Sequence, residues 1–193
     1  MARRKGLTFY QKKKKLNIAL IHEIISWIFW IVMSIILALL VVYCIGMKTS
    51  IIGSSMEPSL YNGQEIFLNR LIYKITSPKV GDVVVFLPNG NEKSHYYVKR
   101  VVAVPGDELY VKSGILYVNN EVQDEYINDK IAEAGLAENK IELGDDEYFV
   151  IGDNCNNSED SRSANIGNIR KEHIIGKAWF KMAAQSSSMG FVN

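Results

Sequence analysis

Two segments of the sequence carry side chains that could hydrolyse a peptide bond together. Ser55 lies in a turn rich in Gly, Ser and Pro, and Lys99 lies in an apolar run that predicts a strand. Alternate residues of a strand share a face, so Lys99 would lie with Tyr97 and Val101 while Arg100 points the other way. Burial on that apolar face would lower the lysine pKa from about 10.4. A neutral amine can then remove the proton of a serine hydroxyl, which predicts Ser55 as nucleophile and Lys99 as general base.

Each of these segments also has an ordinary structural interpretation. A serine in such a turn is usually only a turn residue, and an edge-strand lysine often reaches to water. A third segment, residues 152–162, is dense in Asn, Asp and Ser, which is typical of a well-tied loop or a calcium site. The calcium-loop pattern fails because a Gly at the sixth position and a Glu at the twelfth are missing. We therefore expect no metal and no cofactor.

The polar segments follow a long apolar stretch near the N-terminus. Residues 24–47 carry no formal charge and are rich in Ile, Leu, Val and Trp. At ~1.5 Å per residue a helix of this length would cross a hydrocarbon core of about 30 Å. A cleavable signal peptide would need a shorter apolar region and an Ala-x-Ala-like site, and residues 43–48 offer none. The stretch predicts an uncleaved membrane anchor.

Charge is distributed unevenly along the chain. Residues 1–20 carry seven cations and no acid, whereas the chain from Lys48 onward has 15 Lys or Arg against 20 Asp or Glu. A basic tail before an apolar span predicts a cytoplasmic N-terminus and an extracytoplasmic C-terminal part. The acidic body argues against nucleic acid as a partner. Cys44 lies in the apolar run and Cys155 in the polar part, so we expect no disulfide.

The remainder of the chain predicts a mainly β fold. Short β-rich runs alternate with turn signals such as Asn-Gly, Ser-Gly and Asn-Asn, and they predict strands at residues 65–69, 82–86, 96–104, 108–111, 115–118, 148–151 and 176–182. Residues 129–139 are the best helix candidate of this part, and the tail 185–193 is expected to be frayed. We expect three parts: a basic tail (1–20), a transmembrane anchor (21–47) and a catalytic domain (48–193) with a cap-like insertion at about 113–145.

Four motifs in order behind the apolar run closely resemble those of bacterial type I signal peptidases, in particular the Gram-positive branch. They are Ser-Met-Glu-Pro-Ser-Leu (55–60), Gly-Asp-Val-Val (81–84), Lys-Arg-Val-Val-Ala-Val-Pro-Gly-Asp (99–107) and Gly-Asp-Asn followed by Asn-Ser-Glu-Asp-Ser-Arg (152–162). The resemblance spans about residues 20–180. It implies a membrane-bound serine endopeptidase that removes signal peptides from exported precursors by a Ser/Lys dyad.

The resemblance also implies roles for individual residues. Ser158 would hydrogen-bond the Lys99 amine, Asp160 and Arg162 would form an ion pair near the site, and Arg100 would pair with Asp153. The groove for small substrate side chains would be lined by Ile51, Ile52, Met56, Leu60, Tyr97 and Val98. Some family members have a Ser two residues before the nucleophile, where this chain has Gly53. The oxyanion would therefore rest on backbone N–H groups, that of Ser55 among them.

The implied partners are signal-peptide-bearing precursors and the lipid bilayer of a bacterial plasma membrane, crossed once. Some of the apolar residues near Ser55 are expected to dip into the lipid surface, and the candidates are Met56, Leu60, Tyr61, Phe86 and Leu87. Two other functions remain open: a catalytically inert anchored β-domain that assists surface-protein or pilus assembly, and a self-cleaving SOS-type repressor. The second needs a DNA-binding domain where this chain has the apolar span.

Overall fold

The structure, a computed structural model, describes residues 18–45, 47–91, 93–127, 129–184 and 187–192. It divides into two compact units, Met1–Leu40 and Val41–Asn193. The helix α1 (Ile18–Ile45) makes up the described part of the first unit and ends in the second. Residues Ile18–Tyr43 are long and apolar enough to cross a membrane, and none of their side chains is buried within the protein. Most of the expected basic tail, residues 1–17, lies outside the described residues.

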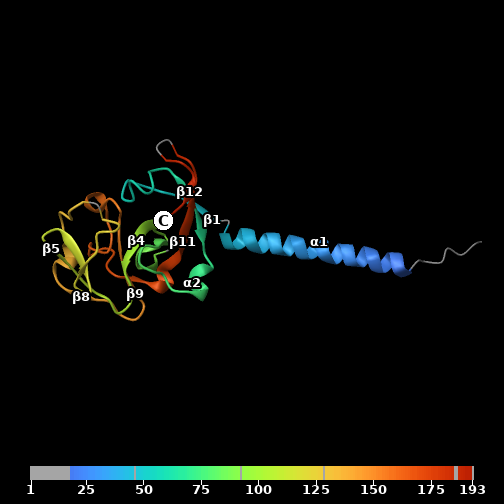
Figure 1. Cartoon of the computed structure of the whole chain (residues 1–193), viewed down its shortest axis with the longest axis horizontal. Helices are drawn as coiled ribbons and strands as arrows, with labels where there is room; N and C mark the ends of the chain where they lie inside the picture. Colours follow the sequence, from blue (N-terminus) through green and yellow to red (C-terminus); the bar gives the residue numbers. More distant parts are fainter. Residues whose placement is uncertain (1–17, 46, 92, 128, 185–186, 193) are drawn as a thin grey trace, which may run out of the picture. The chain divides into compact units, whose positions relative to one another are not determined.

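The larger sheet of the second unit is antiparallel, and several of its strands are labelled in Figure 1. Its strands are, in spatial order, β1 (Met47–Ser50), β2 (Glu65–Asn69), β11 (Ile174–Lys181), β3 (Val83–Phe86), β4 (Tyr97–Ala103), β9 (Glu147–Ile151) and β10 (Ile169–Arg170). A further strand, β12 (Gly190–Phe191), pairs with β11. The tail expected to be frayed therefore contains a paired strand, and that expectation is wrong for these two residues. Aromatic packing explains the pairing, because the Phe191 ring lies 5.7 Å from the Phe180 ring.

A smaller antiparallel sheet follows β4 in the chain and is labelled by β5 and β8 in Figure 1. Its strand order is β7 (Glu121–Val122), β6 (Ile115–Val118), β5 (Glu108–Lys112) and β8 (Ile141–Glu142). Two-residue turns close the hairpins β5–β6 and β6–β7, at Ser113-Gly114 and Asn119-Asn120. All four of these turn residues have positive φ, as the favoured two-residue hairpin turn requires. The expected strands at 65–69 and 115–118 are thus confirmed to the residue, and the others within two residues.

Helical structure beyond α1 is short in the described residues. It comprises α2 (Ile72–Ile75) and four 3₁₀ turns at Pro88–Gly90, Gly135–Glu138, Cys155–Asn157 and Lys171–His173. The helix expected at 129–139 is wrong, since only the 3₁₀ turn forms there. Gly135 explains the failure: its φ is +56°, outside the right-handed helical region, and an added Cβ would meet the Arg162 backbone. The mainly β class with one long N-terminal helix is confirmed.

The central strands β3 and β4 are buried, and they are apolar apart from Lys99 and Arg100 of β4. Every residue of β3 is buried, as are Val98–Ala103 of β4. Burial excludes three of the five lipid-contact candidates, because Met56, Leu60 and Phe86 are fully buried in the protein core. Tyr61 and Leu87 are half-buried, so a lipid contact of these two stays a prediction. Met56 and Leu60 pack in one core cluster and Phe86 in another, although all three lie in turns or at a strand end. A core of this kind gives β4 a rigid position, and β4 carries Lys99.

Candidate active site

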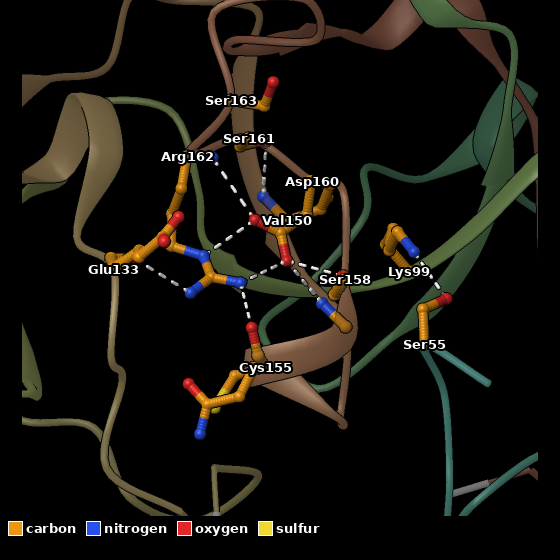
Figure 2. Close-up of polar contacts among 12 residues, drawn as sticks. Ser55, Lys99, Glu133, Val150, Cys155, Ser158, Asp160, Ser161, Arg162 and Ser163 are labelled. Carbon is orange, nitrogen blue, oxygen red and sulfur yellow. Dashed lines mark hydrogen bonds and ion pairs between the residues drawn. The ribbon is translucent and has the colours of Figure 1, made fainter.

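The structure brings the two predicted catalytic side chains together, although 44 residues separate them in the chain. A hydrogen bond of 2.6 Å joins Lys99 Nζ and Ser55 Oγ (Figure 2). Lys99 is held by β4, where its register partner is Val84 of β3, and only 4% of its surface is exposed. Ser55 is half-buried in the turn that follows β1. A nucleophile and a base within hydrogen-bond reach are the geometry that nucleophilic catalysis requires.

Burial gives Lys99 the protonation behaviour of a base. Desolvation lowers the pKa of its amine from 10.5 to about 8, because water no longer stabilises the ammonium form. Nearby carboxylates oppose this effect, Asp160 most strongly and Glu159 next, while the Arg162 guanidinium lowers the pKa further. Burial is the largest of these causes. The amine is therefore neutral in a useful fraction of molecules near neutral pH.

The turn that carries Ser55 is fixed by the loop that follows β9. The backbone N–H of Asn154 donates to the Ser55 carbonyl at 3.0 Å, and the Asn157 side chain donates to the Ser54 hydroxyl at 2.7 Å. Gly152 permits this close approach: an added Cβ there would fall on the Ser55 carbonyl and on the Ser158 hydroxyl. The nucleophile is thus positioned by a segment about 100 residues further along the chain.

The backbone at Ser55 itself offers a free donor. Gly53 has φ +88°, a conformation that glycine adopts readily, and its N–H donates to Asn62 Oδ1 at 2.9 Å. The Ser55 N–H has no hydrogen-bond partner within the described part of the chain. The Gly53 N–H is therefore engaged in holding the turn, whereas the Ser55 N–H is available to an oxyanion.

Arg100 and Asp153 form one of two buried ion pairs beside the site. Arg100 donates from Nε to Asp153 Oδ1 at 2.8 Å and from a terminal nitrogen to Oδ2 at 2.7 Å. Both side chains are at most 5% exposed, and the Tyr126 ring lies 4.6 Å from the Arg100 guanidinium carbon. A two-point contact of this kind fixes orientation as well as distance. It ties the start of the 152–162 loop to β4, next to Lys99.

Asp160 and Arg162 form the second buried pair, shown in Figure 2. Arg162 donates to both Asp160 oxygens, at 2.8 and 2.9 Å, and also to the carbonyls of Cys155 and Glu133. Asp160 in turn accepts from the Gly152 N–H at 3.1 Å. The pair therefore holds the two ends of the loop together.

Ser158 differs from its expected contact. Its hydroxyl donates to Asp160 Oδ2 at 2.7 Å, and no hydrogen bond joins it to Lys99 among the described residues. The expectation of a Ser158–Lys99 hydrogen bond is therefore wrong in this structure. A serine hydroxyl carries one proton, and in this structure the Asp160 carboxylate accepts it.

A cavity of about 360 Å³ opens on Ser55 and Lys99. Four of the six expected groove residues line it: Ile51, Ile52, Tyr97 and Val98. The other two, Met56 and Leu60, are fully buried and do not line it; they pack in one core cluster with Ile51 and Val98. The further lining residues are Gly53, Ser54, Ser94, His95, Tyr96, Asn157 and Glu159. Among the described residues no His, Cys, Asp or Glu group is arranged to hold a metal ion.

Sequence reasoning missed three residues that shape this site. Asn154 and Asn157 hold the turn of Ser55, and Glu159 lines the cavity. The density of Asn in residues 154–157 was a signal for loop-fixing hydrogen bonds, but it did not reveal which segment they would fix. Glu159 gave no signal, because an acid between two polar residues has the appearance of any surface residue.

The chain is similar in sequence to a known protein family and to individual members of it. A family model described as "Signal peptidase, peptidase S26" matches residues 24–183. "Signal peptidase I P" of Bacillus subtilis subsp. natto is 35% identical over 174 residues, covering 86% of this chain and 89% of that protein. "Signal peptidase IB" of Staphylococcus aureus is 35% identical over 177 residues, covering 82% and 89%. A crystal structure of a signal peptidase I from Enterococcus faecalis aligns with 53% of this chain and 97% of its own, at 23% identity and a TM-score of 0.44.

Proposed function

We propose that this chain, which belongs to the signal peptidase family (peptidase S26), is a membrane-anchored endopeptidase that removes signal peptides from exported precursors with Ser55 as nucleophile and Lys99 as general base. The observation that carries the dyad is the 2.6 Å contact between the Lys99 amine and the Ser55 hydroxyl, made by a lysine that is 4% exposed. The named relatives support the substrate class, since each is a signal peptidase I.

The reaction proceeds through an ester. Neutral Lys99 takes the proton of Ser55, the hydroxyl oxygen attacks the peptide carbonyl, and the lysine ammonium returns the proton to the leaving amine. The Ser55 N–H stabilises the oxyanion. A water molecule deprotonated by the same lysine then releases the acyl group from Ser55. Asp153, Asp160, Arg100 and Arg162 touch none of the reacting atoms and act by holding the loop that positions Ser55.

A substrate peptide finds an unpaired strand edge at the cavity. β4 pairs with β9 from Arg100 onward, and in the described part of the chain no strand pairs with its first residues on that side. The Val101 N–H and C=O both bond toward residues 81 and 82, on the β3 side. By alternation, the Val98 N–H and C=O point to the opposite edge, into the cavity that Val98 lines. An extended peptide can add there as a strand and present its small side chains to Ile51, Ile52 and Tyr97.

The anchor fixes where the reaction takes place. Helix α1 crosses the plasma membrane once, with the seven cations of residues 1–20 on the cytoplasmic side and the second unit outside. The catalytic domain starts directly after the span, since β1 begins at Met47, two residues beyond the end of α1. The exported precursor therefore meets Ser55 on the outer side of the bilayer.

The test is cleavage of a preprotein by the full-length chain in detergent. Ser55→Ala and Lys99→Ala are expected to lose cleavage by more than about 1,000-fold, as removal of a nucleophile or its base does in serine proteases. Ser188→Ala and Lys112→Ala are matched controls, because both residues are exposed and lie outside the cavity. Equal cleavage by all four variants would exclude the dyad, and absence of cleavage by the unmodified chain would favour the inert assembly function.

A further inference from the structure

Glu159 carries a carboxylate that lines the candidate active site, and the proposed reaction assigns no role to this carboxylate. It supplies the one carboxylate among the described residues that line the cavity of Ser55 and Lys99, and it is exposed. The other acids of its loop are neutralised: Asp153 by Arg100 and Asp160 by Arg162. Glu159 makes no ion pair with any described residue. A negative charge therefore faces the space that the substrate must enter.

The carboxylate is held in place by neutral donors on both sides. The Tyr97 hydroxyl donates to its Oε2 and the Asn165 side chain donates to its Oε1, each at 3.2 Å. These donors come from β4 and from the segment after the 152–162 loop. A carboxylate fixed by two neutral hydrogen bonds keeps its full charge and its remaining lone pairs for a third partner.

The distance to the reacting atoms is short. Lys99 Nζ lies 5.9 Å from the centre of the Tyr97 ring, whose hydroxyl contacts Glu159. The carboxylate is therefore within roughly 12 Å of the base, a distance that an extended peptide covers in about four residues at ~3.3 Å each. Only side chains close to the cut bond can reach it.

We propose that Glu159 forms a subsite for a cationic side chain, lysine or arginine, of the precursor within about four residues of the cleavage site. This proposal rests on the proposed peptidase function. The apolar wall of Ile51, Ile52 and Val98 accepts the uncharged side chains of the same peptide. Glu159 adds a charge preference on the side of Tyr97 and Asn165, so the enzyme discriminates among precursors by a basic residue beside the cut.

The test uses the full-length chain in detergent and a series of synthetic precursor peptides. The peptides carry Lys or the neutral Gln at one position at a time, from four residues before the cut to four after it. We expect kcat/KM for Lys over Gln to reach roughly three- to five-fold at one position, the size of an ion pair in contact with solvent, and to weaken in 0.5 M salt. In Glu159→Gln the Lys/Gln ratio falls to about one, and in Glu159→Lys a Glu peptide is preferred at that position.

A matched control separates this subsite from a general effect of charge. Glu57→Gln removes a carboxylate two residues from Ser55 that does not line the cavity, so the Lys/Gln ratio is expected to persist. No preference at any position in the unmodified chain, or a preference that survives Glu159→Gln, overturns the proposal while leaving the peptidase function intact. Cleavage that persists in Ser55→Ala overturns the peptidase function instead, which keeps the two failures distinct.

Discussion

The pH dependence of cleavage is the sharpest consequence of the buried Lys99. With a pKa of about 8, the amine is neutral in roughly one molecule of eleven at pH 7, against roughly one in 3,000 at the ordinary value of 10.5. Burial of this one side chain therefore raises the population of competent enzyme at pH 7 by nearly 300-fold. Above pH 9 almost every amine is neutral, so further increase in pH has little effect on the base.

The assay is kcat/KM for a fluorogenic precursor peptide, measured with the full-length chain in detergent from pH 5.5 to pH 10. We expect one ionisation on the acidic limb, a midpoint near pH 8, and a tenfold fall in rate for each pH unit below pH 7, because kcat/KM reports the free enzyme. Glu159→Gln moves the midpoint to lower pH, since the Glu159 carboxylate raises the Lys99 pKa.

Two results would refute this reasoning. A pH midpoint that disappears in His95→Gln would identify the histidine of the cavity as the base. A rate that still rises tenfold per unit at pH 10 would show that Lys99 keeps its ordinary pKa and that burial does not desolvate it. A midpoint shift to higher pH in Glu159→Gln would contradict the sign of the electrostatic argument.

Three further predictions concern stability and positioning. Lys99→Met is expected to raise the free energy of unfolding by about 3 kcal/mol at pH 7, because burial disfavours the protonated amine that the unfolded chain carries without penalty. This gain disappears as the pH rises from 8 to 10.5, where the amine becomes neutral in both states. Arg162→Ala leaves Asp160 buried and unpaired and lowers the free energy of unfolding by roughly 3–5 kcal/mol, whereas the exposed Arg170→Ala costs less than about 0.5 kcal/mol. Gly152→Ala pushes Ser55 from its place and lowers kcat by about 100-fold, whereas Gly190→Ala, with open space around its Cα, does not.

Thermal or denaturant unfolding at pH 7 and pH 10 checks the first two predictions, and single-turnover kinetics checks the third. A Lys99→Met variant no more stable than the unmodified chain at pH 7 would mean that water reaches the amine. An equal decrease in the free energy of unfolding for Arg162→Ala and Arg170→Ala would show that the buried Asp160–Arg162 pair contributes no more to stability than an exposed one. Unchanged kcat in Gly152→Ala would show that the loop tolerates a side chain against the Ser55 turn.

The sequence was sufficient to predict those features of the structure that depend on the local pattern of residues. Alternation in β4 placed Lys99 on a face away from Arg100, and Ser113-Gly114 marked a hairpin turn by residues that adopt positive φ. It was insufficient where tertiary contacts decide. Met56 and Phe86 are large apolar residues next to turns, which suggested contact with lipid, but both are core residues. Whether such a side chain is buried depends on which other parts of the chain pack over it. The sequence likewise did not show which group the Ser158 hydroxyl contacts, because that depends on where the fold places Asp160.

The two buried ion pairs explain how Lys99, on β4, can lose its charge beside a loop rich in acids. Asp153 and Asp160 both raise the Lys99 pKa, and left unpaired they would keep its amine protonated. Arg100 and Arg162 neutralise them through two-point contacts, so the field at Lys99 is weakened and desolvation dominates. Glu159 is the acid of this loop that no arginine pairs with among the described residues. Its charge raises the Lys99 pKa without outweighing desolvation, and it lines the cavity that a substrate peptide would enter. In this loop the buried Asp153 and Asp160 therefore help to position Ser55, whereas the exposed Glu159 is available to contact the substrate.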